Sequence, residues 1–344
     1  MKSIAVIGAG SWGLTIANLL AVKGHKVSLW ARDRVVAGWI EALRYHPKYL
    51  VLDNLRLDNS IRVTFDLELV LDGAQVVIMA VPSHAMREVG ELAKPHIKEE
   101  VLVLSLAKGI ERNTLLRMSQ VLEDVLGPQF EKQIAVLSGP NHAEEVSRGK
   151  PSATVISSVC KATALELQDV FMAPYFRVYT NADLVGIELG GATKNVIAVA
   201  AGICDGLGYG DNTKASLLTR GLAEMIRLGL AMGADARTFA GLAGMGDLVV
   251  TCMSEHSRNR LAGEMIGKGM SLKQIKNEME MVAEGVRTTR AIKDLADKYG
   301  VIMPIASETA EVLYGGKKPG DSVLRLMNRD AVQEIPAIAW KYQI

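Results

Sequence analysis

The chain has 344 residues, of which 49% are hydrophobic and 22% are charged, so it can bury a sizeable core and form two domains. Its 39 basic and 38 acidic residues leave a formal net charge of +1, which argues against a surface dedicated to nucleic acid or to an anionic membrane. We therefore expect no nucleic-acid partner, and any site for an anion must be local.

The first 180 residues alternate short β-branched runs with amphipathic helical segments, which is the pattern of repeated βαβ units. Strands that are apolar on both faces need helices on both sides, so this pattern predicts an α/β, Rossmann-like, doubly wound sheet. The runs that we expect to be strands are 4–7, 27–30, 61–64, 76–80, 101–105, 134–137 and 153–156.

After about Tyr179 the strand-like runs end, and the chain has the pattern of helices separated by glycine clusters. The natural boundary is the turn at 180–183, where Asn181 or Asp183 would cap the first helix of a second, all-α domain. We therefore predict a dinucleotide-binding domain in residues 1–180 and a helical substrate domain in residues 181–344.

A glycine-rich turn follows the first expected strand and opens a helix. Its glycines allow a tight turn and close approach of the backbone to a pyrophosphate, while the start of the helix supplies free N–H groups. Such a string alone is a weak signal in a chain with 32 glycines, but its place between a strand and a helix favours dinucleotide binding over a purely structural turn. The residues are Gly8, Ala9, Gly10, Ser11, Trp12 and Gly13.

The end of the second expected strand carries the charges Arg32, Asp33 and Arg34. Folds specific for NAD usually place an acidic residue here to bind the ribose. The two arginines suit a 2′-phosphate, so NADP is an expected cofactor, yet Asp33 between them leaves the choice between NADP and NAD open. The alternative is that all three are solvated charges at the start of a helix.

Lys194 lies in an apolar, small-residue segment that we expect to be helical. At helical spacing its neighbours are Gly190, Gly191 and Ala198, so we expect a face cleared of bulk that a substrate and a nicotinamide ring can approach. A buried ammonium needs an anionic partner or a function, because its desolvation is costly. We interpret Lys194 as catalytic, and the alternative is a lysine that reaches solvent from a packing helix.

Reduction of a ketone develops negative charge on its oxygen, which a protonated lysine can stabilise and then protonate. The reverse reaction needs a neutral lysine. With an ordinary lysine pKa of about 10.4, oxidation would improve as the pH rises.

Two further stretches follow expected strands at the edge where a doubly wound sheet binds its ligands. Lys108 follows the fifth strand, and Gly139 and Asn141 follow the sixth. Both stretches also have the composition of ordinary turns, but their location favours a functional interpretation.

The segment 256–260 packs histidine, serine, two arginines and asparagine behind the glycine-rich stretch that contains Asp247. Guanidinium, hydroxyl and amide donors together suit a phosphate, and the alternative is an exposed polar start of a helix. Glu284 is either an interdomain hydrogen-bonding group or an exposed charge.

The cysteines, Cys160, Cys204 and Cys252, are too few and scattered for a disulfide framework and form no C-x-x-C pair, so we expect a reducing, cytoplasmic location and no metal site. The N-terminus has no signal-peptide pattern, and the longest apolar stretch, Val196 to Cys204, is too short to cross a bilayer. We expect a buried helix there and no membrane insertion.

Taken together, the motifs resemble those of the bacterial-type NAD(P)-dependent glycerol-3-phosphate dehydrogenases. They occur in the family's order: G-A-G-S-W-G, S-L-A-K-G-I-E, S-G-P-N-H-A-E-E-V, E-L-G-G-A-T-K-N and H-S-R-N-R, with G-L-G-Y-G-D-N and V-A-E-G-V-R-T-T alongside. The resemblance implies reversible reduction of dihydroxyacetone phosphate to glycerol 3-phosphate, which serves phospholipid synthesis. It implies Lys194 as the proton-transfer residue.

The resemblance also implies two sets of binding residues. Those at the cofactor are Ser11, Trp12, Arg32, Tyr49, Lys108, Ala143, Arg258, Val282 and Glu284, besides the glycines of the turn. Those at the substrate are Lys108, Gly139, Asn141, Lys194, Asp247, Ser257, Arg258 and Asn259. Asn141 stands where the family commonly has serine or threonine.

Two other functions fit parts of the pattern. A β-hydroxyacid or ketopantoate-type reductase also joins a dinucleotide domain to a helical domain with a catalytic lysine, but it acts on carboxylates, whereas the segment 256–260 suits a phosphate. A regulator that binds NAD(P)H without turnover has no need of a proton donor. We expect a phosphorylated small-molecule substrate, and a homodimer is compatible with the sequence.

Overall fold

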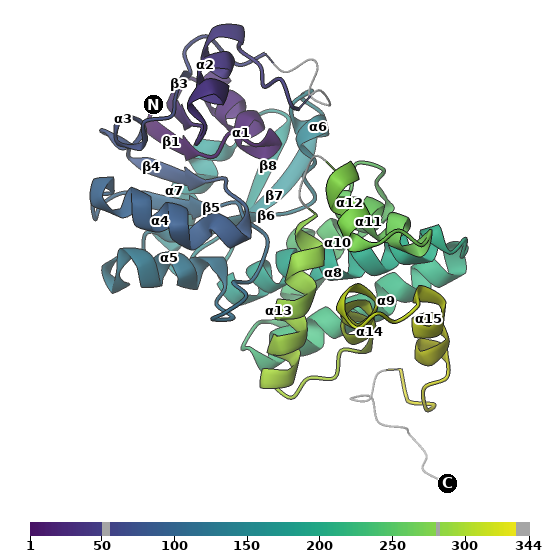
Figure 1. The fold of residues 1–344 in the computed structure, drawn as a ribbon. Coiled ribbons are helices and arrows are strands. Elements are labelled where there is room, and N and C mark those ends of the chain that lie inside the picture. Colours follow the sequence, from purple (N-terminus) through teal and green to yellow (C-terminus); the bar gives the residue numbers. More distant parts are fainter. Residues whose placement is uncertain (50–55, 280–282, 335–344) are drawn as a thin grey trace.

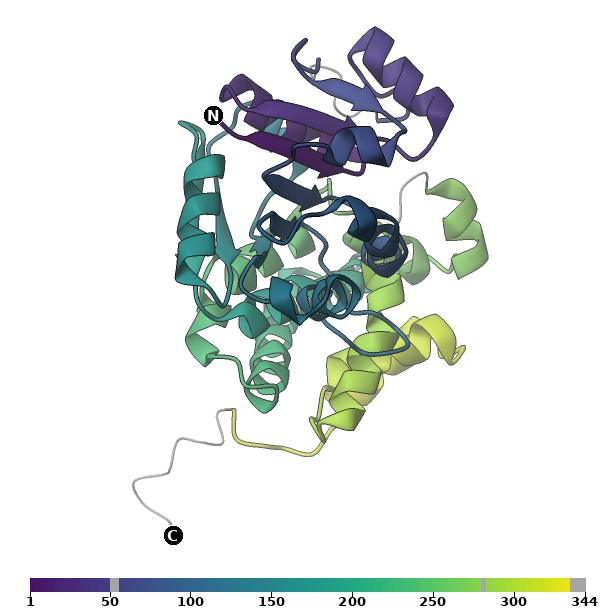
Figure 2. The same ribbon diagram turned by 90° about the vertical axis from the view of Figure 1, so that its left-hand side faces the viewer.

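The computed structural model describes residues 1–49, 56–279 and 283–334. An eight-stranded sheet comes first in the chain and a group of helices follows it; the two halves lie side by side in Figure 1, and the sheet half lies in front of much of the helical half in Figure 2. The sheet has the order β3-β2-β1-β4-β5-β6-β7-β8. Its strands are β1 (Ser3–Ile7), β2 (Lys26–Trp30), β3 (Arg62–Thr64), β4 (Val76–Met79), β5 (Leu102–Ser105), β6 (Ile134–Ser138), β7 (Ser152–Ser157) and β8 (Phe176–Asn181).

Helices cover both faces of the sheet, as the doubly apolar strands predict (Figure 1). In β1, Ile4 and Val6 belong to the core beneath α1 and α7, while Ala5 and Ile7 belong to the core beneath α4 and α5. Successive side chains of a strand point to opposite faces, so one strand supplies both cores. The helices of this half are α1 (Ser11–Val22), α2 (Arg34–Leu43), α3 (Leu67–Leu71), α4 (Met86–Ala93), α5 (Met118–Leu126), α6 (Ala143–Val146) and α7 (Lys161–Phe171).

Two features of the sheet differ from the expected parallel array. β7 pairs with β6 antiparallel, because the connection between them holds only the short α6 and the chain folds back. β8, which we did not expect, pairs with β7 in parallel as the last strand of the sheet. Arg177 and Tyr179 of β8 are exposed, so this edge strand lacks the continuous apolar run of the inner strands.

Asp183 begins the helical half as an N-cap. Its Oδ1 accepts a hydrogen bond of 2.8 Å from the backbone N–H of Gly186, which confirms one of the two caps that the sequence suggested. The helices that follow are α8 (Leu184–Gly206), α9 (Asp211–Ala231), α10 (Asp247–Met253), α11 (Arg258–Gly267), α12 (Leu272–Glu278), α13 (Glu284–Lys298), α14 (Pro304–Tyr314) and α15 (Pro319–Met327).

The axis of this half is α8, which is buried from Gly186 to Cys204. By length and composition it is the one described helix that could cross a membrane, and 89% of its apolar window is buried inside the protein. This confirms the buried helix expected at Val196 to Cys204.

Glycines bring α8 and α11 into direct backbone contact. A Cβ on Gly202 of α8 would lie 1.9 Å from the carbonyl oxygen of Arg260, and one on Gly263 of α11 would lie 2.0 Å from that of Val199. Both distances are far below a van der Waals contact, so only glycine fits at these crossings. The start of α11 is therefore held in a fixed position relative to α8.

The strands that carry functional loops end at one edge of the sheet. Ile7 pairs with Met79, Met79 with Ser105, and Ser105 with Val136, so β1, β4, β5 and β6 finish side by side. The strand order reverses between β1 and β4, which is where doubly wound sheets place their ligand crevice.

Candidate active site

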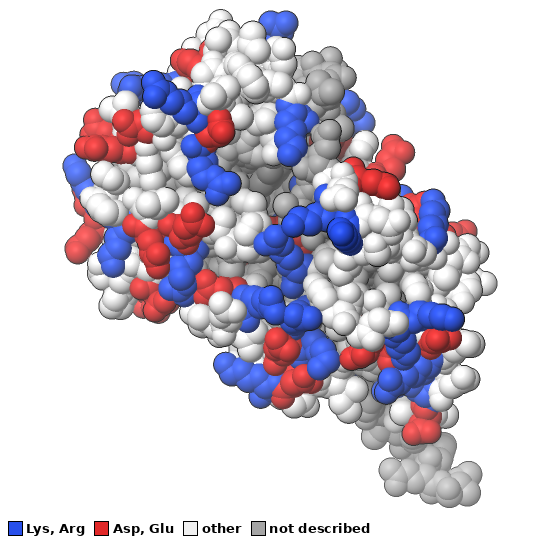
Figure 3. Space-filling view, viewed as in Figure 1, with Lys and Arg blue, Asp and Glu red and all other residues white. Residues whose placement is uncertain are grey.

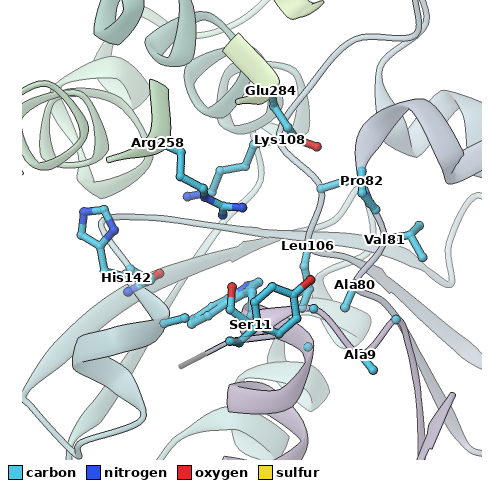
Figure 4. Close-up of a pocket in the computed structure, with 18 of the residues that line it drawn as sticks. Ala9, Ser11, Ala80, Val81, Pro82, Leu106, Lys108, His142, Arg258 and Glu284 are labelled. Carbon is cyan, nitrogen blue, oxygen red and sulfur yellow. The ribbon is translucent and has the colours of Figure 1, made fainter. Parts of the chain in front are cut away.

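A cavity of about 620 Å³ lies at this edge, between the sheet and the helical half, and residues from both halves line it (Figure 4). Basic side chains border the junction of the two halves on the surface (Figure 3). The structure brings together there most of the residues that the sequence singled out: Gly8, Gly10, Ser11, Trp12, Gly13, Arg32, Tyr49, Lys108, Asn141, Ala143, Lys194, Asp247, Ser257, Arg258, Asn259 and Glu284. Gly139 does not line the cavity among the described residues, and Val282 lies outside them.

The glycine-rich turn connects β1 to α1 at the reversal of strand order. Gly8 has φ +117°, and a Cβ there would lie 2.7 Å from the carbonyl oxygen of Ala80, which follows β4. A Cβ on Gly13 would lie 1.9 Å from the carbonyl oxygen of Gly8. No side chain in the described part of the protein caps α1, so its first N–H groups remain for a ligand. Backbone donors at a tight turn fit the pyrophosphate of a dinucleotide.

The charges after β2 have separate tasks. Asp33 caps α2, since its Oδ1 accepts hydrogen bonds from the N–H groups of Val35 at 2.8 Å and Val36 at 2.9 Å. The guanidinium of Arg34 lies over the Phe65 ring, 5.2 Å from its centroid. Arg32 lines the cavity, whereas Arg34 is not among the described lining residues. Of the two arginines, Arg32 is therefore the one placed to meet a 2′-phosphate.

Lys194 lies at the centre of a buried ionic cluster. Its Nζ donates to Asp247 Oδ1 at 2.8 Å and to Thr251 Oγ1 at 2.5 Å. The other oxygen of Asp247, Oδ2, accepts from Lys108 Nζ at 2.6 Å, and that ammonium also donates to the carbonyl oxygen of Gly139 at 2.9 Å. One carboxylate thus pairs with two lysines, and Gly139 acts on the site by holding Lys108.

Counting donors shows what this cluster leaves free. An ammonium has three N–H groups, and each lysine has two acceptors within the described part of the chain. Each lysine therefore keeps one donor for an oxygen in the cavity. Two such donors beside each other suit a carbonyl oxygen that gains negative charge.

The environment tunes the Lys194 ammonium. Burial lowers its pKa from the ordinary value of about 10.5 to about 8, and the Asp247 carboxylate opposes part of that shift. Burial would raise the pKa of Asp247, but the charges and hydrogen bonds of Lys108 and Lys194 prevail and lower it. At neutral pH the cluster therefore holds an ionised Asp247 and a protonated Lys194 that can release its proton.

Lys194 does not extend to solvent, because it is only 5% exposed. The expectation that neighbouring glycines clear space for a ligand is wrong. A Cβ on Gly190 would lie 2.6 Å from the carbonyl oxygen of Ala243, and one on Gly191 would lie 2.8 Å from Ser138 Oγ. The absence of side chains at these two glycines allows Ala243 and Ser138 to pack against α8.

Two asparagines join the walls of the cavity. Asn195, next to Lys194, donates to the carbonyl oxygen of Lys108 at 3.3 Å and accepts from Asn259 Nδ2 at 2.9 Å. The Oδ1 of Asn259 accepts from the N–H of Gly285 at 2.8 Å. This chain of amides links the loop after β5 to α8, α11 and α13, so the oxygen and one of the two N–H groups of the Asn259 amide serve the fold.

Arg258 begins α11 and extends into the cavity (Figure 4). Ser257 caps the helix through its Oγ, which accepts from the N–H of Arg260 at 3.3 Å. Arg260 points elsewhere and pairs with Asp205 at 2.6 Å. A guanidinium at the N-terminus of a ten-residue helix forms a positive end to the cavity, which suits a phosphate.

The remaining expected residues complete the walls. Glu284 accepts from the N–H of Ser83 at 2.9 Å, and burial raises its pKa, so it connects α13 to the loop after β4. Tyr49 lies near the turn, with its hydroxyl 4.0 Å from the place of a Cβ on Gly10. Asn141 donates through Nδ2 to the carbonyl oxygen of Ala153 at 2.9 Å, and its Oδ1 is buried without a hydrogen-bond partner among the described residues.

Three residues of the site were not recognised from sequence: Thr251, Asn195 and His142. Thr251 follows Asp247 by four residues on α10, and a polar pair at that spacing in an otherwise apolar helix was an available signal. Asn195 adjoins Lys194 in the same motif. His142 lines the cavity, but nothing local in the sequence distinguishes it from a histidine at the start of a helix.

Comparisons with known proteins cover both halves. The model of the NAD-dependent glycerol-3-phosphate dehydrogenase N-terminus matches residues 3–164, and the model of the C-terminus matches residues 183–324. A glycerol-3-phosphate dehydrogenase [NAD(P)+] of Moorella thermoacetica is 49% identical over 339 residues, which are 98% of this chain and 99% of the relative. One from Salinibacter ruber is 50% identical over 334 residues, or 97% of each chain.

Solved structures agree. The glycerol-3-phosphate dehydrogenase of Coxiella burnetii superposes with a TM-score of 0.90 at 35% identity, covering 95% of this chain and 99% of that one. A ketopantoate reductase from Ralstonia eutropha has a TM-score of 0.58 at 18% identity, covering 93% and 99% of the two chains. The second likeness extends to the fold alone.

Proposed function

Because this chain belongs to the NAD-dependent glycerol-3-phosphate dehydrogenase family, we propose that it interconverts dihydroxyacetone phosphate and sn-glycerol 3-phosphate with NAD(P). The observation that carries this proposal is the position of Lys194, a buried ammonium held by Asp247 and Thr251 in a cavity that also contains the glycine-rich turn and Arg258. The chain is an oxidoreductase with a Rossmann-like cofactor domain.

Lys194 provides the proton in this proposal. A nicotinamide cofactor, when bound in the cavity, would supply the hydride. Lys194 donates its free N–H to the ketone oxygen, stabilises the charge that forms there and transfers the proton. Lys108 supplies a second donor to the same oxygen, while Asp247 and Thr251 hold the Lys194 amine in place. In the reverse direction the neutral amine of Lys194 accepts the proton of the alcohol.

Arg258 and Ser257 bind the substrate phosphate at the N-terminus of α11 in this proposal, and Asn259 contributes the amide hydrogen that the fold leaves free. Asn141 offers its unpartnered Oδ1 as an acceptor for a substrate hydroxyl. This pairing of a phosphate end with a ketone end favours a phosphorylated ketone over the carboxylate substrate of a ketopantoate-type reductase.

We assign the cofactor contacts to residues of the glycine-rich turn and to residues that line the cavity. The glycines of the turn with Ser11 and Trp12 bind the pyrophosphate side, and Arg32 meets the adenine ribose. Tyr49, Lys108, Ala143, Arg258 and Glu284 complete the cofactor site in this proposal. We also propose that residues 1–180 bind the cofactor and residues 181–344 the substrate, that the enzyme acts in the cytoplasm with its three cysteines reduced, and that a homodimer is its assembly.

The test follows NADH and NADPH oxidation with dihydroxyacetone phosphate, with ketopantoate and unphosphorylated dihydroxyacetone as controls. We expect turnover with dihydroxyacetone phosphate and little with either control. Turnover with ketopantoate alone would contradict the proposed substrate, and binding of NAD(P)H without turnover would indicate a sensor.

A further inference from the structure

The short segment 254–257 joins two helices of the site. It connects the end of α10, which carries Asp247, to the start of α11, which begins with Arg258. Ser254 is the C-cap of α10, and its carbonyl oxygen accepts a hydrogen bond of 3.2 Å from the N–H of Ser257, the N-cap of α11. The conformation of this segment therefore sets where the N-terminus of α11 lies relative to α10.

Arg260 holds the segment from within α11. Its Nε donates to the carbonyl oxygen of Ser254 at 3.1 Å, and its Nη1 donates to Asp205 Oδ2 at 2.6 Å. Asp205 lies near the end of α8, the helix that carries Lys194. One guanidinium thus connects the main chain at the end of α10 to a carboxylate of α8.

The Asp205 carboxylate joins three helices. Its Oδ2 pairs with Arg260 of α11, and its Oδ1 pairs with Lys214 Nζ of α9 at 2.6 Å. The three side chains are only 15–21% exposed, so salt and solvent screen these ion pairs only in part. Gly202 and Gly206 flank Asp205 on α8 and let the backbone of α11 approach closely. The carboxylate therefore faces Arg260 across a fixed crossing of two helices.

The two arginines at the start of α11 have separate tasks. Arg258 extends into the cavity (Figure 4), whereas Arg260 and Asp205 are not among the described residues that line it. We propose that Asp205 and Arg260 are positioning residues for the substrate phosphate. They hold the segment 254–257 so that Ser257 and Arg258 face the phosphate. This inference rests on the proposed function, because that function supplies the phosphorylated substrate.

The expected consequence is selective. A guanidinium binds a phosphate through N–H groups in a fixed geometry, so a small shift of the start of α11 weakens that contact. The reacting end depends on other contacts, because Asp247 and Thr251 hold the Lys194 ammonium. Loss of the positioning pair should therefore act on phosphorylated substrates and leave the chemical step intact.

Asp205→Asn tests this role, because it keeps the side-chain volume and removes the charge that Arg260 and Lys214 share. We expect KM for dihydroxyacetone phosphate to rise about tenfold, near the low end for loss of a hydrogen bond to a charged group. We expect kcat, and kcat/KM for unphosphorylated dihydroxyacetone, to stay within about twofold. Arg260→Lys should reproduce this pattern, because one ammonium replaces a guanidinium whose Nε and Nη1 serve two acceptors.

Glu264→Gln is the matched control. Glu264 also pairs with Arg260, at 3.3 Å, but it lies in α11 itself, and its loss leaves the contacts of Arg260 with Asp205 and Ser254 in place. It should change neither KM. Lys214→Met removes the other partner of Asp205 and should lower Tm without changing the preference for the phosphorylated ketone.

Several results would overturn the positioning role. One is an unchanged KM for dihydroxyacetone phosphate in folded Asp205→Asn and Arg260→Lys variants, and another is an equal loss with both ketones. A third is a rise in KM that follows the fall in Tm in Lys214→Met as well, since the effect would then reflect stability alone. If Asp205→Asn does not fold, Arg260→Lys, which keeps a cation opposite Asp205, decides the question.

Failure of this inference is distinguishable from failure of the proposed function. If the parent protein reduces dihydroxyacetone phosphate no better than dihydroxyacetone, there is no phosphate site to position and the proposed function is wrong. If the parent prefers the phosphorylated ketone and Arg258→Ala removes that preference, while Asp205→Asn and Arg260→Lys keep it, the positioning role alone is wrong.

Discussion

The two ends of the cavity are built by different means. At the cofactor end, the turn from Gly8 to Gly13 presents backbone N–H groups, and its shape depends on the absence of side chains. At the reacting end, Lys108, Lys194 and Asp247 present charges from three separate elements, held by one shared carboxylate. At the first end Gly8 and Gly13 have no room for a Cβ, whereas at the second end each charge has an opposite charge as its partner.

This difference predicts which measurement responds to a change at each end. A change in the turn alters the binding of the cofactor and the stability of the fold, because backbone contacts belong to both. A substitution in the lysine cluster that keeps the side-chain volume but removes the charge alters the rate of the chemical step. The following substitutions test that separation.

Lys194→Met should have the largest effect, because methionine keeps the length of the side chain and removes the proton and the charge. We expect kcat to fall about 10² to 10⁴-fold. Cofactor affinity, measured by fluorescence titration with NADPH, should change little because the turn is untouched. Lys268→Met is the control, since Lys268 is an exposed lysine paired with Glu264. A folded Lys194→Met variant with near-normal kcat would contradict the mechanism.

Gly13→Ala should act mainly on cofactor binding and stability. Its Cβ would lie 1.9 Å from the carbonyl oxygen of Gly8, so the turn must shift, and overpacking of this kind costs about 1–3 kcal/mol. Thermal unfolding and NADPH titration measure the loss. Gly38→Ala in α2 meets no atom within 4 Å and should be neutral or stabilising. Equal behaviour of the two variants would show that the turn is not closely packed.

Arg258→Ala should weaken the binding of dihydroxyacetone phosphate far more than the binding of unphosphorylated dihydroxyacetone. A hydrogen bond to a charged group contributes about 1.5–3 kcal/mol, so kcat/KM for the phosphorylated ketone should fall about 10 to 150-fold. Arg237→Ala, at an exposed arginine paired with Asp235, is the control. Equal losses for both substrates would assign Arg258 to the cofactor alone.

The pH dependence should report the buried ammonium. Reduction needs protonated Lys194, so kcat for reduction should fall as pH rises through about 8, approaching tenfold per pH unit. Oxidation needs the neutral amine and should rise over the same range. Asp247 raises the pKa of Lys194, so Asp247→Asn should move both midpoints to lower pH. Profiles that stay flat from pH 7 to 9 would remove Lys194 as the titrating group.

Arg32→Ser should have the smallest effect and should separate the two cofactors. We expect KM for NADPH to rise several-fold and KM for NADH to change little, because only NADPH carries the 2′-phosphate. Arg34→Ser is the matched control, since Arg34 stacks on Phe65. Because Asp33 caps α2, Asp33→Ser should keep the cap and leave cofactor preference unchanged. A shift toward NADPH in that variant would show that Asp33 binds the ribose.

Local patterns predicted most of the sheet, the turn, and a cap at either Asn181 or Asp183, of which the structure has Asp183, because each depends on residues close in sequence. They did not predict β8, whose outward Arg177 and Tyr179 interrupt its apolar character. Lys194 and Asp247 are 53 positions apart in the sequence. The sequence therefore showed that the Lys194 ammonium needs an anionic partner, but it did not show which residue is that partner. The neighbour of Gly190 could not be predicted either, because the backbone that packs against it comes from Ala243, far away in the sequence.

The contact between α8 and α11 also determines which molecules fit. Lys194 lies on α8 about two turns before Gly202, and Arg258 begins α11 at the same crossing. Because backbone touches backbone there, the main-chain segments that carry Lys194 and Arg258 keep a fixed separation, and only the rotamers of these two side chains can change the spacing between the ketone end and the phosphate end. Under the proposed function, a ketone with a much longer carbon chain before its phosphate would reach Arg258 only with its carbonyl displaced from Lys194. We therefore expect the fixed separation of the two main-chain segments to limit the length of the substrate.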